Sequence, residues 1–143
     1  MKTRVFTAGL LVYGGKALFL KRKRNDDTYP GLWDCLGGHF EAGESAEDCM
    51  TREAKEESGL DVELVKTGRL IEYSDRYGRS IAVPFLLNSG SDRVVVSEHS
   101  GYRWVSPSAV ARYRKVPALD QVLRIFGLVP LHTEQRRRAT PGR

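Results

Sequence analysis

The sequence has few cysteines and no long apolar run, and both shortages limit what this protein can be. Its two cysteines, Cys35 and Cys49, form no Cys-x-x-Cys pair, which argues against a disulfide framework and a cysteine-based zinc site. The longest apolar-leaning stretch, residues 6–13, is far shorter than the roughly 20 residues that cross a bilayer. No small-residue cleavage site follows it, so we interpret it as a first strand and not as a signal peptide. We therefore expect a cytoplasmic protein with no membrane partner.

The composition and charge are those of an ordinary folded domain. Of the 143 residues, 41% are hydrophobic and 29% are charged, and one domain typically takes ~150 residues. We expect a single domain over residues 1–131. The net charge is +5, and residues 132–143 carry most of the excess, with four arginines against one glutamate. This segment is predicted to be a frayed, solvated tail, an interpretation that we favour over a nucleic-acid-binding arm.

Strand patterns dominate the chain and helical patterns are fewer. The pair Gly14-Gly15 predicts a hairpin turn between two strands over residues 3–13 and 17–20. Further strands are predicted at 62–73, 80–87 and 102–105, with a turn at 75–78, and short helices at 110–113 and 119–126. Hairpins outnumber βαβ units, so we expect an α/β fold in which helices pack on a mixed sheet.

A helix is predicted between two well-marked ends. Ser45, followed three residues later by Asp48, resembles a capping box at the start. The helix should run to Ser58, where Gly59 can take the left-handed conformation that ends a helix.

The side chains of this helix do not separate cleanly into an apolar and a polar face. At roughly 100° per residue, Ala46, Met50 and Ala54 form a core-facing stripe. Glu57 lies only about 20° from its centre, and Glu53 and Glu56 lie about 60° and about 120° from it. The opposite, solvent-facing side is predicted to hold Asp48, Arg52 and Lys55.

Three glutamates on one flank repel one another, and burying one of them costs several kcal/mol unless its charge is compensated. Lys55, a cation close to them in sequence, points away. A bound divalent cation such as Mg²⁺ would resolve both problems, because hard cations take carboxylate oxygens. The alternative is an acidic, solvated face that pairs with basic residues from elsewhere in the chain.

The spacing around these glutamates resembles the signature of the Nudix hydrolase family at every defined position. The match is Gly38-x5-Glu44-x7-Arg52-Glu53-Ala54-x-Glu56-Glu57-x-Gly59-Leu60. In one departure, Leu36 stands just before the two glycines where the family usually has proline, which would restrict the backbone of that loop.

The resemblance implies an α/β/α sandwich that hydrolyses a diphosphate linkage in a nucleoside diphosphate joined to another group. It implies Mg²⁺, with Mn²⁺ as a substitute, held by Glu53, Glu56, Glu57 and the backbone carbonyl of Gly37. Such ions offset the charge of the phosphates and help water to attack phosphorus. Glu53 would also accept the proton of the attacking water.

The resemblance also suggests roles for residues near the signature. Arg52 is similar to the family residue that holds the glutamates by ion pairing, although the helical projection places it on the far side, where it would tie the helix to a loop. Glu44 would shape the loop or bind a metal through water.

Four further residues are candidates for the reaction or for substrate binding. Glu98, with His99 beside it, is an alternative proton acceptor, since some Nudix enzymes take this group from a later loop; a simple turn cap is the competing interpretation. Lys23 or Arg22 matches the place where relatives put a basic residue on the phosphates. Tyr77 follows Leu60 at a spacing seen in dinucleoside polyphosphate hydrolases of the family, but it could equally lie on the sheet surface.

The substrate is the least determined feature. A compact chain favours a small nucleotide, such as a nucleoside triphosphate cleaved to monophosphate and pyrophosphate. Dinucleoside polyphosphates, ADP-ribose and sugar nucleotides stay open, although Asp75 stands where ADP-ribose hydrolases often have proline. A non-catalytic nucleotide sensor and an isopentenyl diphosphate isomerase are disfavoured, the first by the complete signature and the second by the chain length. Many relatives are dimers, so a homodimer is an open expectation.

Overall fold

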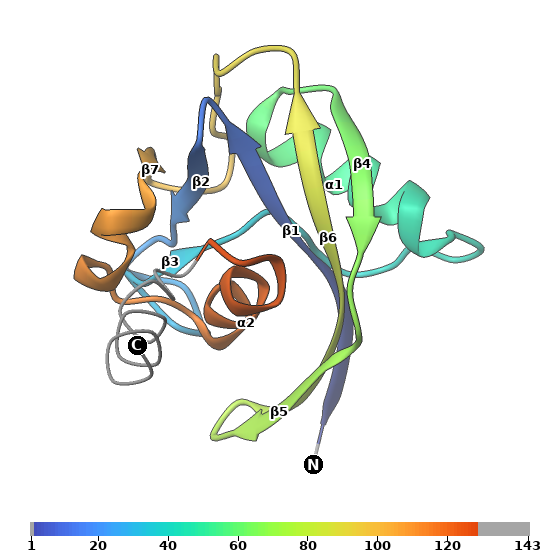
Figure 1. Ribbon diagram of the computed structural model, residues 1–143. Helices are drawn as coiled ribbons and strands as arrows, with labels where there is room; N and C mark the ends of the chain where they lie inside the picture. The colour runs from blue at the N-terminus through green and yellow to red at the C-terminus, as the bar shows by residue number, and fades with distance from the viewer. Residues whose placement is uncertain (1, 129–143) are drawn as a thin grey trace, which may run out of the picture.

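The computed structural model describes residues 2–128, and its strands form one mixed sheet flanked by helices (Figure 1). The bounds of the elements are, in chain order, β1 Thr3–Tyr13, β2 Lys16–Lys21, β3 Trp33–Asp34, α1 Ala46–Ser58, β4 Val62–Thr67, β5 Ile71–Asp75, β6 Gly78–Ser89, β7 Gly101–Val105, the 3-10 helix η1 Pro107–Arg112 and α2 Pro117–Phe126. The expected mixed sheet with packed helices is confirmed.

Strand β1 is the centre of the sheet. It pairs in parallel with β6 along most of its length, from Thr3 opposite Arg79 to Val12 opposite Asn88. On its other side it forms the predicted hairpin with β2, and Gly14 and Gly15 turn the chain with φ of 59° and 78°. Such positive φ values are the conformations that favour glycine. β3 and β7 extend the sheet beyond β2, and β4 and β5 both pair with β6.

Successive side chains of β1 point to opposite faces, which creates two hydrophobic cores. Leu10 belongs to the core beneath α2, together with Leu119 and Leu123. Leu11 belongs to the core beneath α1, together with Met50. The two helices therefore cover opposite faces of the sheet (Figure 1), which gives the α/β/α sandwich.

The stretch 62–73 differs from the single strand predicted for it. The chain leaves β4 after Thr67 and enters β5 at Ile71. Between them, Gly68 approaches the other elements so closely that a Cβ there would lie 2.7 Å from a side-chain carbon of Ile125 in α2. The expected helix at 110–113 is the 3-10 helix η1, and α2 begins earlier than predicted, at Pro117.

Both predicted ends of α1 are present. The Ser45 side chain accepts a hydrogen bond of 3.1 Å from the Asp48 amide, and Gly59 ends the helix with φ of 76°. Within residues 2–128, no helix is long and apolar enough to cross a membrane. The expected basic tail, residues 132–143, lies outside the described residues.

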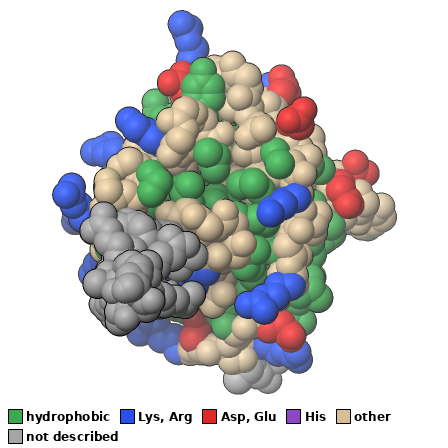
Figure 2. All heavy atoms as spheres, in the orientation of Figure 1, with side chains coloured by type: hydrophobic (Ala, Val, Ile, Leu, Met, Phe, Trp, Pro, Cys, Tyr) green, Lys and Arg blue, Asp and Glu red, His purple; other side chains and the backbone are tan. Residues whose placement is uncertain are grey.

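Among residues 2–128, the large exposed hydrophobic side chains do not come from one element of the fold. On the face shown in Figure 2, lysine and arginine side chains lie around the rim and hydrophobic side chains lie between them. The large exposed hydrophobic residues are spread over β1, β4 and the loops: Val5, Tyr13, Val65, Leu70 and Val95. A homodimer therefore stays a prediction.

Candidate functional site

A cavity of about 550 Å³ lies at the edge of β1 where the loop between β3 and α1 passes it. Side chains of α1 form its acidic wall. The start of β1, Arg22, the 28–41 segment, β5, the loop before β7 and the start of α2 form the rest. The lining includes Arg4, Phe6, Thr7, Arg22, Tyr29, Gly37, Gly38, Arg52, Glu53, Glu56, Glu57, Tyr73 and Glu98. The structure thus brings the predicted glutamates together with residues distant in the sequence.

The loop that carries the two glycines is bonded along β1. The Gly9 amide donates to the Leu36 carbonyl at 2.6 Å, and the Thr7 amide donates to the Gly38 carbonyl at 2.9 Å. At Gly37, where φ is 143°, a Cβ would lie 1.9 Å from the Thr7 carbonyl oxygen. A Cβ at Gly38 would lie 2.2 Å from a carboxylate oxygen of Glu53. The backbone contact and the positive φ therefore require glycine at position 37, whereas a side chain at position 38 would displace the Glu53 carboxylate.

Leu36, which departs from the usual proline, has its own support. Its side chain is buried in the core beneath α1. Its amide donates a 3.2 Å hydrogen bond to the Gly9 carbonyl, a bond that proline could not make because it lacks the N–H group. Leucine therefore holds the loop by hydrogen bonding where proline would hold it by restricting φ.

Glu57 is buried, as its place near the apolar stripe predicts. Its side chain is only 8% exposed, and one carboxylate oxygen accepts a 2.8 Å hydrogen bond from the Gly37 amide. None of the described lysines or arginines forms an ion pair with it. Burial raises the pKa of Glu57 well above its usual range, and the charges of Asp34, Glu53 and Glu98 add to that effect. A cation beside this carboxylate would be strongly favoured.

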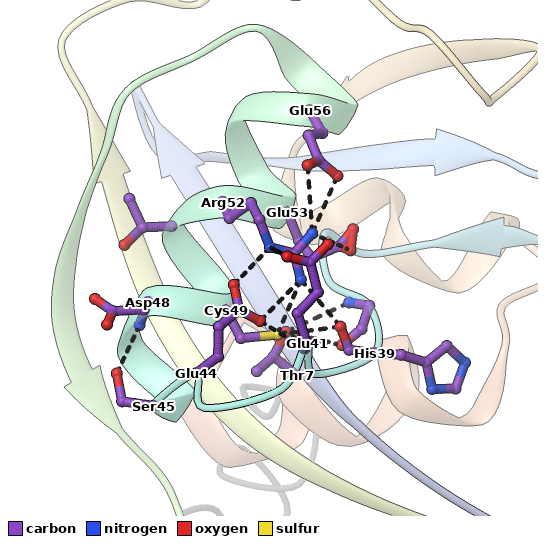
Figure 3. Close-up of polar contacts among 12 residues, drawn as sticks. Thr7, His39, Glu41, Glu44, Ser45, Asp48, Cys49, Arg52, Glu53 and Glu56 are labelled. Atoms are coloured by element: carbon purple, nitrogen blue, oxygen red, sulfur yellow. Dashed lines mark hydrogen bonds and ion pairs between the residues drawn. The ribbon is translucent and has the colours of Figure 1, made fainter.

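Arg52 contacts both the loop before α1 and the glutamates of the helix. Its Nε donates to Glu44 at 2.6 Å, and its Nη1 lies 3.2 Å from Glu56 and 3.4 Å from Glu53. Figure 3 shows the guanidinium among these carboxylates. The projection did not show the contact with Glu53, because it ignores the reach of a long arginine side chain. The contacts fit both interpretations: Arg52 pairs with the glutamates, and it ties α1 to the loop through Glu44 and the His39 carbonyl.

The other acidic side chains around Arg52 differ in their surroundings. The hydrogen bond from Arg52 lowers the pKa of Glu44 to about 2. Burial raises the pKa of Glu53, and only part of this is offset by the Arg52 charge. The Glu56 side chain is 57% exposed. The cavity wall therefore holds one buried, one partly buried and one exposed carboxylate on the same flank.

The donor set fits a hard divalent cation. Its groups are carboxylate oxygens plus the backbone at Gly37, and Mg²⁺ prefers oxygen ligands. As the side chains lie, no group of three acidic, histidine or cysteine side chains among residues 2–128 surrounds one common point. Two of the three carboxylates, Glu53 and Glu56, are instead turned toward Arg52 (Figure 3). Glu57, buried without a cationic partner, is the observation that favours an ion here.

Glu98 lines the cavity. It is distant from α1 in the sequence, but its loop is hydrogen-bonded to that helix. The Ser97 hydroxyl donates to the Glu56 carbonyl at 2.8 Å, and the Val95 amide donates to the Ser58 carbonyl at 2.9 Å. These bonds hold the Glu98 loop against the end of α1 that carries the glutamates. His99 is partly buried, its Nδ1 has no hydrogen-bond partner among the described residues, and burial lowers its pKa.

The three residues predicted to bind substrate, Arg22, Lys23 and Tyr77, differ in whether they reach the cavity. Arg22 lines the cavity, but its donors already bind Asp34 at 2.8 Å and the Thr28 carbonyl at 2.9 Å. Lys23 is exposed and outside the lining. Tyr77 is also outside it, and its ring packs edge-on against Tyr29 with centroids 4.6 Å apart. Only Arg22 of the three reaches the cavity itself.

Several lining residues were not predicted, and three of them matter for the shape of the cavity. Arg4, Tyr29 and Tyr73 form the end of the cavity away from the signature. Arg4 and Tyr73 come together only because both pair with Ser80 of β6, a register that no local pattern encodes. The sequence feature that could have drawn attention to Tyr29 is its place just before the turn residues Pro30-Gly31.

The family model described as the NUDIX domain matches residues 3–126. The nucleoside triphosphatase NudI of Salmonella arizonae is 28% identical over 141 residues, which cover 90% of this chain and 100% of that protein. A MutT protein structure from Methanosarcina mazei has 27% identity and a TM-score of 0.74, covering 86% of this chain and 92% of its own. The E. coli ORF135 protein has 26% identity and a TM-score of 0.69, covering 88% and 89%.

The chain belongs to the Nudix family and is a hydrolase of that class. The expectation drawn from the signature is thereby confirmed over the whole domain.

Proposed function

We propose that this protein hydrolyses nucleoside triphosphates to nucleoside monophosphate and pyrophosphate, with Mg²⁺ as cofactor and Mn²⁺ as a substitute. The observation that carries the proposal is Glu57, a buried carboxylate without a cationic partner in the described chain, beside Glu53 and Glu56. The Salmonella arizonae relative is a nucleoside triphosphatase by name, which supports the choice of substrate. Because nucleoside triphosphates form a cytoplasmic pool, we place the reaction there.

Glu56, Glu57, Glu53 and the Gly37 carbonyl would hold the metal. Bound Mg²⁺ supplies the positive charge that lets the anionic diphosphate approach this acidic wall and stabilises the leaving phosphate. The Gly37 amide keeps the Glu57 carboxylate turned to the loop at 2.8 Å. Arg52 limits the repulsion between Glu53 and Glu56 by contacting both.

Proton transfer from the attacking water is assigned to Glu53, with Glu98 as the alternative. Burial raises the pKa of Glu53, which makes its carboxylate a better proton acceptor than an ordinary glutamate. Glu98 faces the same cavity and is held near α1 through Ser97. The two are separated by comparing pH profiles of Glu53→Gln and Glu98→Gln, since removing the acceptor abolishes the acidic limb of kcat.

Residues near the cavity contribute to nucleotide binding in different, mostly indirect ways. Arg22 binds Asp34 and Thr28 and so holds the 25–31 loop over the cavity. Lys23, next to it and exposed, adds positive charge along the path that phosphates take into the site. Tyr77 supports the ring of Tyr29 from behind. We propose these as secondary contributions to substrate binding.

The test is a product assay on a panel of nucleoside triphosphates, ADP-ribose, sugar nucleotides and dinucleoside polyphosphates, with and without Mg²⁺. We expect pyrophosphate and monophosphate from triphosphates only when Mg²⁺ is present. Glu56→Gln and Glu57→Gln should lose this activity while folding normally. Glu47→Gln, on the exposed first turn of α1, is the matched control and should keep it. A folded wild-type protein that binds a nucleotide but cleaves none of the panel would overturn the proposal in favour of a sensor.

A further inference from the structure

The end of the cavity opposite the glutamates is built by three neighbouring strands. Arg4 of β1 and Tyr73 of β5 both stand beside Ser80 of β6. Arg4 and Tyr73 line the cavity, and Ser80 is fully buried beneath them. The Nη2 of Arg4 donates to the Ser80 hydroxyl at 2.9 Å. The sheet register thus places a guanidinium at a defined position in the wall.

Arg4 has few partners for a partly buried arginine. Arg4 donates to Ser80 and also acts on the Tyr29 hydroxyl, but it forms no ion pair with a carboxylate among residues 2–128, and its buried Nε has no acceptor there. By contrast, Arg22, Arg52 and Arg79 each pair with a carboxylate at 2.8 Å or less. A buried cation that lacks a counter-charge and leaves donors unused gains free energy from a ligand that brings acceptors.

An aromatic wall stands next to this guanidinium. The Arg4 carbon Cζ lies 5.9 Å from the centre of the Tyr29 ring. The Tyr29 hydroxyl donates to Asp75, and its backbone has φ of 46°, unusual for a residue other than glycine. Arg22 holds the same loop through Thr28. A flat ring held in a fixed place beside a guanidinium is a suitable wall for a nucleobase.

The distance from the acidic wall suits this assignment. The Thr7 amide binds the Gly38 carbonyl, next to the glycine whose amide holds Glu57. Arg4 is three residues earlier on the same strand, which is about 10 Å at the usual rise of a strand. Because Arg4, Tyr29 and the glutamates line the same cavity, a nucleotide with its diphosphate at the glutamates can reach Arg4 and Tyr29 with its base.

We propose that Arg4 makes the enzyme prefer nucleotides whose base presents a carbonyl oxygen, such as hypoxanthine, guanine or uracil, over bases that present an amino group there, such as adenine and cytosine. The proposal rests on the proposed function. A guanidinium carries only donors, so it binds carbonyl and ring-nitrogen acceptors and repels an exocyclic amino group. An amino base would leave donors facing donors in a partly buried site, which is costly.

The experiment compares kcat/KM for two matched substrate pairs, ITP against ATP and dUTP against dCTP. Within each pair, the carbonyl and amino groups exchange at one ring position. We expect about a 10-fold preference for the carbonyl member in the wild type, the size given by one well-placed arginine contact with a base. Arg4→Gln, whose amide both donates and accepts, should bring both ratios close to one. Arg79→Gln, which removes an exposed arginine from a neighbouring position of the sheet, should leave them unchanged.

The outcomes separate this inference from the function on which it rests. Wild-type ratios near one for both pairs, or an Arg4→Gln variant that loses activity equally on both members, would overturn the role of Arg4 while the hydrolase stands. If Arg4→Gln does not fold, the same two kcat/KM ratios are measured for Arg4→Lys and compared with those of the wild type. If no triphosphate is cleaved, the proposed function fails, and calorimetric binding of ITP and ATP to the wild type then tests the preference directly.

Discussion

The amide of Gly37 donates a 2.8 Å hydrogen bond to the carboxylate of Glu57. The bond joins the loop that runs along β1 to helix α1. This bond links the residue just before the Nudix signature to one of its glutamates. It uses one oxygen of a side chain that is otherwise buried without a cationic partner in the described chain. The site therefore has a defined shape before any ion binds, and Glu57 carries an electrostatic cost that an ion would relieve.

Replacing Glu57 should separate stability from activity. We expect Glu57→Gln to lower Mg²⁺-dependent kcat by more than about 100-fold, because one ligand is lost. Without metal, the same variant should have a free energy of unfolding about 1 kcal/mol higher than the wild type. The substitution removes the cost of burying the Glu57 carboxylate, and the glutamine oxygen can still accept the hydrogen bond from Gly37. Activity assays with Mg²⁺ check the first expectation, and urea unfolding without Mg²⁺ checks the second. A variant that is less stable as well as inactive would contradict the account.

The close contact at Gly38 predicts a specific loss of function. A Cβ at this position would lie 2.2 Å from Glu53, so Gly38→Ala should displace that carboxylate. We expect kcat to fall about 10- to 100-fold, because displacing a catalytic group by about 1 Å has effects of this size. Gly90→Ala, at a position with open space around it, is the control. Equal activity of the two variants would show that Glu53 does not need its present position.

Restoring the proline that is usual in the family should harm this chain. Leu36→Pro removes the bond from the Leu36 amide to Gly9 and the buried side chain beneath α1. We expect a loss of about 2 kcal/mol or more in the free energy of unfolding. Urea unfolding with Leu36→Ala alongside isolates the hydrogen bond, because alanine loses the packing but keeps the amide. A proline variant more stable than the alanine variant would mean that restricting φ outweighs this bond.

The pair of Glu44 and Arg52 predicts a stability change in acid. Its hydrogen bond lowers the pKa of Glu44 from 4.5 to about 2. A carboxylate whose pKa is depressed in the folded state contributes stability above its unfolded pKa and loses it as the pH falls. The stability difference between the wild type and Glu44→Gln should therefore be full at pH 6 and shrink between about pH 4.5 and pH 2. Urea midpoints across this range measure it, and a difference independent of pH would refute the prediction.

The features encoded in short segments were predictable from the sequence. Ser45 and Gly59 mark both ends of α1, Gly14-Gly15 marks the hairpin, and Glu57 shows its burial by its place on the apolar stripe. These are effects of local conformational preference and of helical period, which residues close in sequence determine.

The features that depend on distant contacts were not predictable in the same way. The projection predicted that Arg52 ties α1 to a loop, but it did not show that the side chain also reaches Glu53 and Glu56, because a projection follows the backbone and ignores the length of the side chain. The break in the strand pattern at 62–73 arises where Gly68 approaches α2. Arg4 and Tyr73 meet through a three-strand register that only the folded sheet creates. Tertiary packing, not propensity, decides each of these cases.

The most direct test of the central claim is binding of Mn²⁺, followed by electron paramagnetic resonance, to wild type and to Glu57→Gln in the presence of a non-hydrolysable nucleoside triphosphate analogue. The account predicts saturable binding to the wild type and binding weakened at least about 10-fold in the variant, with both proteins folded. Equal binding to the two proteins, or none to folded wild type at saturating Mn²⁺, would contradict it.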